Sequence, residues 1–214
     1  FIVNHHGPTC TIPQADNSNF TPSSPSSLYP NSATAGHPST AIGSLAGNVL
    51  TIPVANLKTF AKFTCTFTNA ANAQTVAIQK ITTGSFGGPF TVTATNLSAV
   101  PAGITTTAVG TAAPVAPTAI SVSTASTAVT VTEGVSASYT ISTATCTDAN
   151  ASITGNPASF GTLSGQVLTI PAANVLLAAN ITCTFTNAAK PATVAVQTIT
   201  TGGFGVPFPF SVNN

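Results

Sequence analysis

Residues 75–92 read TVAIQKITTGSFGGPFTV, and this stretch decides the fold. Thr75, Val76, Ala77 and Ile78 open it with the β-branched and small residues typical of a short strand, and the cluster GSFGGPF predicts a turn or bulge. The stretch returns at residues 193–210 as TVAVQTITTGGFGVPFPF, an offset of 118 residues. An internal repeat of this kind predicts a chain built from tandem copies of one β-rich unit.

Two further segments obey the same offset. GSLAGNVLTIP at 43–53 returns at 161–171 as GTLSGQVLTIP, and TCTFTNA at 64–70 returns unchanged at 182–188. Cys10 and Cys146 lie 136 residues apart, which predicts 18 extra residues in the first copy, within 17–37. That segment, NSNFTPSSPSSLYPNSATAGH, is a loop by composition.

The repeat divides the chain into three parts. A complete unit is predicted at 72–189, an incomplete one at 1–71, and the opening strand of a further unit at 190–214. Further strands are predicted at 119–122, 129–132 and 181–185, with no sustained helical period. The fold class is therefore all-β, as tandem β-sandwiches. We expect Phe86, Phe90, Phe185 and Phe204 in the cores.

The composition excludes several functions. Charged residues make up 3% of the chain and the net charge is +1, which provides no basic surface for nucleic acid. No apolar run is long enough to cross a membrane. No catalytic triad or cofactor motif is present, and His5, His6 and His37 lack the accompanying ligands of a metal site. We expect a non-enzymatic protein without cofactor or metal, much of whose surface is buried in an assembly.

Four strings carry a family resemblance. VTVTEGVSASYTIS at 129–142, TCTDANASITG at 145–155, VLTIPAANV at 167–175 and ITCTFTNA at 181–188 resemble the prealbumin-like repeats of bacterial surface proteins, relatives of pilin shaft and collagen-adhesin B-type domains. The resemblance implies Greek-key sandwiches strung together outside the cell, at a bacterial surface. It also implies that Lys80 and Asn187 form an isopeptide bond assisted by Glu133. The alternative is a surface lysine beside an ordinary asparagine, and Thr198 replaces the lysine in the last copy.

The cysteines fit an oxidising compartment. Their number is even and no CxxC pair is present, so we expect disulfides Cys10–Cys65 and Cys146–Cys183, with buried free thiols as the alternative.

The predicted function is that of a structural subunit of an extracellular filament, a homopolymer joined head to tail. Its donor strand, inserted into the 1–71 domain of the next subunit, would carry Thr193, Val194, Val196, Ile199, Phe204, Phe208 and Phe210. The segment 190–214 lacks about 40 residues of a complete unit. This favours a second mechanism, in which the chain is an excerpt from a longer covalent array of repeats and the missing strands lie in the same polypeptide. An adhesin that binds a ligand through loop 17–37 is the competing class.

Overall fold

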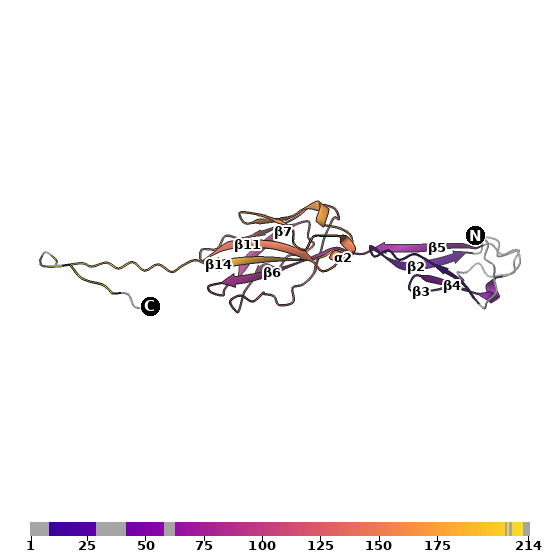
Figure 1. Ribbon diagram of the computed structural model, residues 1–214, viewed down its shortest axis with the longest axis horizontal. Helices are drawn as coiled ribbons and strands as arrows, with labels where there is room; N and C mark the ends of the chain where they lie inside the picture. Colours follow the sequence, from indigo (N-terminus) through magenta and orange to yellow (C-terminus); the bar gives the residue numbers. More distant parts are fainter. Residues whose placement is uncertain (1–8, 29–41, 58–62, 204, 206, 212–214) are drawn as a thin grey trace.

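The computed structural model describes residues 9–28, 42–57, 63–203, 205 and 207–211 (Figure 1). The elements are, in chain order, β1 Thr9–Pro13, β2 Phe20–Leu28, β3 Ser44–Ala46, β4 Val49–Pro53, η1 Val54–Asn56, β5 Thr64–Ala71, β6 Thr75–Thr83, β7 Phe90–Thr95, β8 Gly103–Ile104, β9 Ile120–Ser121, β10 Val129–Glu133, β11 Tyr139–Asp148, α2 Ala151–Thr154, β12 Thr162–Ser164, β13 Val167–Ile170, η2 Ala172–Asn174 and β14 Asn180–Ala189. The all-β class predicted from the sequence is confirmed.

Strands β6 to β14 form a two-sheet sandwich, the middle sandwich. One sheet has the order β12-β13-β10-β7-β8 and the other the order β11-β14-β6-β9. Alternate residues of β6, β10 and β14 point into the core between the sheets, because successive side chains of a strand lie on opposite faces. The core consists of fully buried residues such as Val76, Val131, Ile181 and Phe185.

The first strand of this sandwich, β6, pairs in parallel with its last strand, β14. Asn180 pairs with Thr75 and Ala188 with Thr83, while β11 flanks β14 on its other side in antiparallel pairing. Strand β14 is thus hydrogen-bonded along both of its edges.

The first sandwich, residues 9–71, is smaller. Its sheets are β1-β4-β3 and β2-β5, and its core is the cluster of Ile42, Leu50 and Ile52. In the part of the chain that the structure describes, β5 pairs with β2 alone. The first sandwich and the middle sandwich lie in line along the long axis of the molecule (Figure 1).

Comparison of the registers shows that the first sandwich repeats the second half of the middle one. The β1–β4 pair matches β10–β13: Ile12 lies opposite Leu50 as Val131 lies opposite Leu168. The β2–β5 pair matches β11–β14, down to an irregularity at the same place in both. The first sandwich therefore lacks only the counterparts of β6 to β9 among its described strands.

The prediction of an 18-residue loop insertion at 17–37 was wrong. Residues 20–28 form β2, and residues 29–37 lie outside the described part of the chain. The error came from aligning Cys10 with Cys146. Cys10 is on β1, the counterpart of β10, while Ser27 holds the register position of Cys146, opposite Cys65. Prolines that read as loop signals are accommodated because β2 is an edge strand, where a missing N–H is tolerated.

The predicted aromatic core is confirmed in part. Phe90 and Phe185 are buried, but Phe86 is 58% exposed, because it lies in the turn between β6 and β7 instead of on a strand. Phe204 lies outside the described residues.

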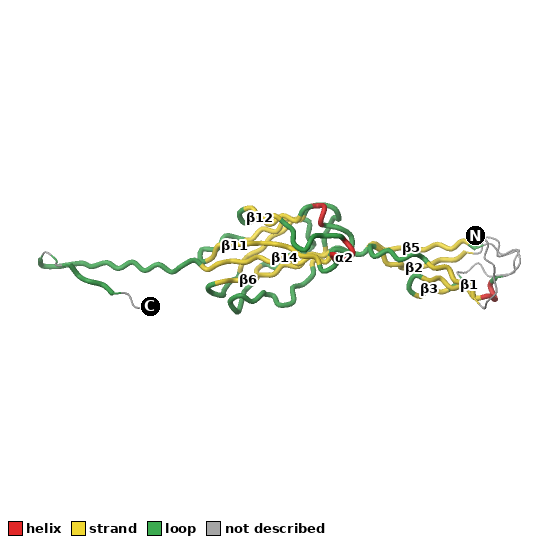
Figure 2. Tube along the Cα trace, viewed as in Figure 1, coloured by secondary structure: helices red, strands yellow, loops and turns green. Residues whose placement is uncertain are grey.

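The tail that follows β14 is extended and pairs with no described strand. It leaves the end of the middle sandwich opposite to the first sandwich, and Figure 2 shows its described part as loop throughout. Val194 and Ile199 are 88% and 82% exposed. Exposed apolar side chains on an extended segment are typical of a strand that is not paired with a sheet edge.

The carboxylate of Asp148 ties the end of β11 to the neighbouring loops. It accepts hydrogen bonds from the backbone N–H groups of Asn150 and Asn180 at 2.9 Å, from the hydroxyl of Thr154 at 2.7 Å and from Nδ2 of Asn156 at 2.8 Å. Burial raises the pKa of Asp148, but these four bonds outweigh burial, so the pKa lies below its ordinary value.

Replacing Asp148 by Asn is therefore expected to lower the free energy of unfolding by roughly 2–3 kcal/mol, since bonds to a charged acceptor are lost or weakened. Because the folded pKa is lowered, the stabilisation is present above the ordinary pKa of an Asp and is lost as the pH falls through the lowered value, below about 4. Denaturant titrations across pH check both points. The control is Asp16→Asn, an exposed carboxylate, and an equal loss in both variants would contradict the role of Asp148.

Candidate functional site

Three polar side chains meet in the core of the middle sandwich. Lys80 lies on β6, Glu133 at the end of β10 and Asn187 on β14, each at an inward position of its strand. Their residues are 1%, 3% and 1% exposed. The three residues continue the series of alternate, inward-facing positions that carry apolar side chains elsewhere on these strands. The fold therefore brings together the three residues that the family resemblance implied.

The three groups form one connected network. Lys80 Nζ makes a buried ion pair with Glu133 Oε2, and Asn187 Nδ2 donates a hydrogen bond to Glu133 Oε1. The lysine nitrogen lies 4.5 Å from the ring centroid of Phe90 and 5.6 Å from that of Phe185. Asn187 Oδ1 is buried and has no hydrogen-bond partner within the described part of the chain.

Burial lowers the pKa of Lys80, and the hydrogen bond and charge of Glu133 oppose that effect without cancelling it. The neutral amine is a nucleophile, whereas the ammonium is not. Glu133 contacts both the lysine nitrogen and the amide nitrogen of Asn187, so it is placed to take a proton from one and pass it to the other. The site thus holds an amine, a proton carrier and an amide in one enclosed network.

The first sandwich has the same positions with different residues. Gln14 is the counterpart of Glu133: its N–H donates to Asn48 O at 2.8 Å, as that of Glu133 donates to Gln166 O at 3.0 Å. Asn69 is the counterpart of Asn187 on β5. Gln14 Oε1 is buried without a hydrogen-bond partner among the described residues. Sequence reasoning missed Gln14, and the signal that identifies it is the strand register.

The core-facing side of β5 is less covered than that of β14. Phe63, Cys65 and Phe67 are only half-buried, whereas their counterparts in and beside β14 (Ile181, Cys183 and Phe185) are at most 2% exposed. In the middle sandwich the difference is made up by β6 and β7. The first sandwich thus has an incompletely covered core along β5.

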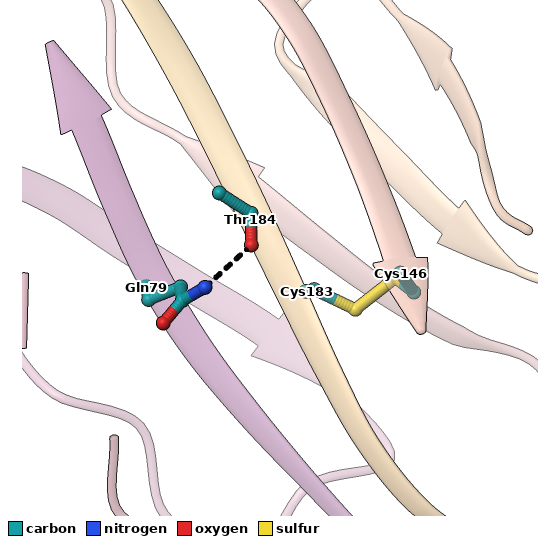
Figure 3. Close-up of a disulfide and its surroundings, with 4 residues drawn as sticks. All are labelled: Gln79, Cys146, Cys183 and Thr184. Carbon is teal, nitrogen blue, oxygen red and sulfur yellow. Dashed lines mark hydrogen bonds between the residues drawn. A yellow bond between two sulfur atoms is a disulfide. The ribbon is translucent and has the colours of Figure 1, made fainter. Parts of the chain in front are cut away.

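A disulfide joins Cys146 and Cys183 across the paired strands β11 and β14, which are the residues expected for the second copy. Figure 3 shows the disulfide beside a side-chain hydrogen bond between β14 and β6, in which Gln79 Nε2 donates to Thr184 Oγ1 at 2.8 Å. The two links fasten β14 to a neighbour on each side.

The bridge Cys10–Cys65 stays a prediction, because the side chain of Cys10 lies outside the described set. Its position on β1 makes the expected bridge different in kind from Cys146–Cys183, since it would join the two sheets of the first sandwich. Non-reducing peptide mapping is expected to recover a Cys10–Cys65 peptide pair. Recovery of Cys10 joined to Cys146 or Cys183 would contradict it.

The described residues hold no other chemistry-bearing cluster. No group of three potential metal ligands occurs among them, and His5, His6 and His37 lie outside them. Nor does that part of the chain contain a helix with the length and apolar character needed to span a membrane.

Comparison with known proteins gives one match. A family model described as a prealbumin-like fold domain matches residues 76–189, which is more than half of the chain. No curated protein and no solved structure matched. The matched span contains β6 to β14, the disulfide and the buried network of Lys80, Glu133 and Asn187. By that match, the chain belongs to the family of prealbumin-like fold domains.

Proposed function

We propose that this protein is a structural subunit of an extracellular fibre, in which the tail of each subunit completes the first sandwich of the next. The observation that carries the proposal is that the tail repeats the part of a unit that the first sandwich lacks. Residues 193–201 repeat β6, and residues 208–213 stand at the positions of β7. Domains of this family are typically found in extracellular surface proteins, where a structural role is usual.

The parallel pairing of β14 with β6 supplies the register of the proposed junction. Carried over by the offset of 118, it places Ala195 beside Thr64, Gln197 beside Thr66 and Thr201 beside Ala70. Gln197 and Thr66 would then repeat the hydrogen bond between Gln79 and Thr184. A strand added to a sheet edge gains continuous main-chain hydrogen bonds, while alternate side chains fill the core.

The connections before the two copies of the strand are alike. Three residues, 72–74, join β5 to β6, and three residues, 190–192, join β14 to the tail copy. The N–H of Asn72 donates to Asn19 O at 2.9 Å, and that of Lys190 donates to Ser138 O at 2.8 Å at the equivalent place. A junction between subunits would therefore reproduce the step already present between the two sandwiches of one chain.

Residues 193–201 and 208–213 would supply the counterparts of β6 and β7. In the middle sandwich the segment 97–128, which follows β7, contains only the two-residue strands β8 and β9. Because the tail of one subunit pairs with a different surface, the first sandwich, of the next, the contact is heterologous and propagates. Deleting residues 192–214 tests the proposal, because it removes the donor strand and leaves both sandwiches intact.

We also propose that the buried network of the middle sandwich forms a covalent cross-link between Lys80 and Asn187. Lys80 Nζ attacks the Asn187 side-chain carbonyl carbon, the new C–N amide bond replaces the bond to Nδ2, and Nδ2 leaves as ammonia. Glu133 accepts the proton of the lysine ammonium, and during the attack it relays a second proton from the attacking nitrogen to the departing nitrogen, so that Glu133 ends as the neutral acid when ammonia leaves. A cavity of about 350 Å³ with Glu133 and Asn187 in its wall gives ammonia an exit. The link would join the first and last strands, which are parallel neighbours, and a pull along the fibre would load that link.

A further inference from the structure

The residue that faces the buried acid or amide differs between the two copies of the opening strand. In β6 it is Lys80, which faces Glu133 and Asn187. In the tail it is Thr198, and the first sandwich holds Gln14 and Asn69 at the facing positions. The charged strand therefore goes with the charged sandwich, and the uncharged strand with the uncharged one.

The first sandwich is prepared for a small hydrogen-bond donor. Gln14 Oε1 is buried without a partner in the described part of the chain, which is unfavourable for an amide oxygen. Insertion of the tail would place Thr198 at the position of Lys80, and because the Thr hydroxyl reaches less far than the Lys80 ammonium, a bridging water would complete its hydrogen bond to Gln14 Oε1. The inserted strand would then satisfy a polar atom that the isolated subunit leaves unpaired.

We infer that Thr198 and Gln14 are specificity-determining residues that direct the tail to the first sandwich and away from the middle one, an inference that rests on the strand donation proposed above. A tail in place of β6 would leave Glu133 buried without its cation. A lysine-bearing strand in the first sandwich would bury an ammonium beside a neutral amide. Loss of one partner of a buried charge pair is strongly unfavourable, so each mismatch is selected against.

This pairing rule solves a problem that the repeat creates. The tail and β6 are so similar that either could enter either sandwich by apolar fit alone: Val194 and Val196 stand where Val76 and Ile78 stand. Before the proposed Lys80–Asn187 bond forms, wrong insertion in the middle sandwich would displace β6 and end fibre growth. A single polar position sets register and partner in the same way as a buried Asn does in a coiled coil.

Full-length variants test the inference. Thr198→Lys is compared with Thr201→Lys, which adds the same charge at the counterpart of the exposed Thr83, and with Thr198→Met, which adds similar length without charge. Both positions are in the exposed tail, so neither change should unfold the subunit. The critical concentration for fibre assembly is expected to rise at least about 100-fold for Thr198→Lys, and less than about 10-fold for the other two.

The double variant Gln14→Glu/Thr198→Lys decides the matter, because it rebuilds the charged pair of the middle sandwich at the junction. It is expected to bring the critical concentration back to within about 10-fold of the wild-type value. Equal assembly of Thr198→Lys and Thr201→Lys, or no recovery in the double variant, would overturn the pairing rule while fibres of the unmodified chain still depend on the tail. If deletion of the tail leaves assembly unchanged, strand donation itself is wrong and the pairing rule falls with it.

Discussion

Deletion of residues 192–214 is expected to convert a fibre-forming protein into monomers. The tail brings Val194, Val196, Phe208 and Phe210, which are 50–88% exposed in the isolated subunit. Complete burial of four such side chains contributes roughly 6–12 kcal/mol by the usual transfer values, before the ordering of the strand is subtracted. No other described segment supplies an exposed apolar run of this kind. Electron microscopy and sedimentation of both forms check the result.

A matched pair of point variants distinguishes insertion of the tail into the first sandwich from nonspecific hydrophobic association of the tail. Val196 is the counterpart of the buried Ile78, and Thr201 is the counterpart of the exposed Thr83. Val196→Asp should block assembly nearly as well as the deletion does, because it puts a carboxylate into the core. Thr201→Asp should leave assembly close to normal. Fibres of unchanged width from the truncated chain would mean that lateral surface contacts hold the assembly together.

The second large effect concerns the buried network. After reduction and denaturation, the intact mass is expected to lie about 17 Da below the sequence mass, because formation of the amide releases one ammonia. The bond closes a loop from residue 80 to residue 187, and the chain-entropy model gives about 4 kcal/mol for a loop of that order already shortened by a disulfide. A thermal midpoint well above that of the unlinked sandwich should follow.

The control for that prediction must not leave a buried charge. Glu133→Gln alone would do so, because Lys80 would lose its partner, and the ensuing loss of stability would say nothing about the bond. The double variant Lys80→Met/Glu133→Gln removes the nucleophile and both charges at nearly constant volume. It should show the unshifted mass and lower stability. An unshifted mass in the wild-type protein would rule out the cross-link.

Much of this fold could be predicted from the sequence, because strand alternation and the repeat are local signals. β6, β10 and β14 follow from their patterns, and Cys146–Cys183 follows from cysteine number and position. Strand β2 could not be predicted in this way. Its segment is rich in Ser and Pro, and the pairing with β5 that makes it a strand is a long-range contact.

The candidate site was predictable to a similar extent. Lys80, Glu133 and Asn187 came from a family resemblance, while their convergence depends on a sandwich that brings strands 53 and 54 residues apart together. Gln14 was missed because the alignment of Cys10 with Cys146 put the first copy in the wrong register. Only the register of β1 against β4 corrects it.

The measurement that tests strand donation most directly is a cryo-electron microscopy reconstruction of the assembled fibre at side-chain resolution. The account predicts residues 193–201 of one subunit as a strand parallel to β5 of the next, with Gln197 beside Thr66 and Thr198 beside Gln14. It also predicts Phe208 and Phe210 in the core of that first sandwich. A map in which the tail is absent from that sandwich, or in which residues of the same polypeptide fill the place beside β5, would contradict it.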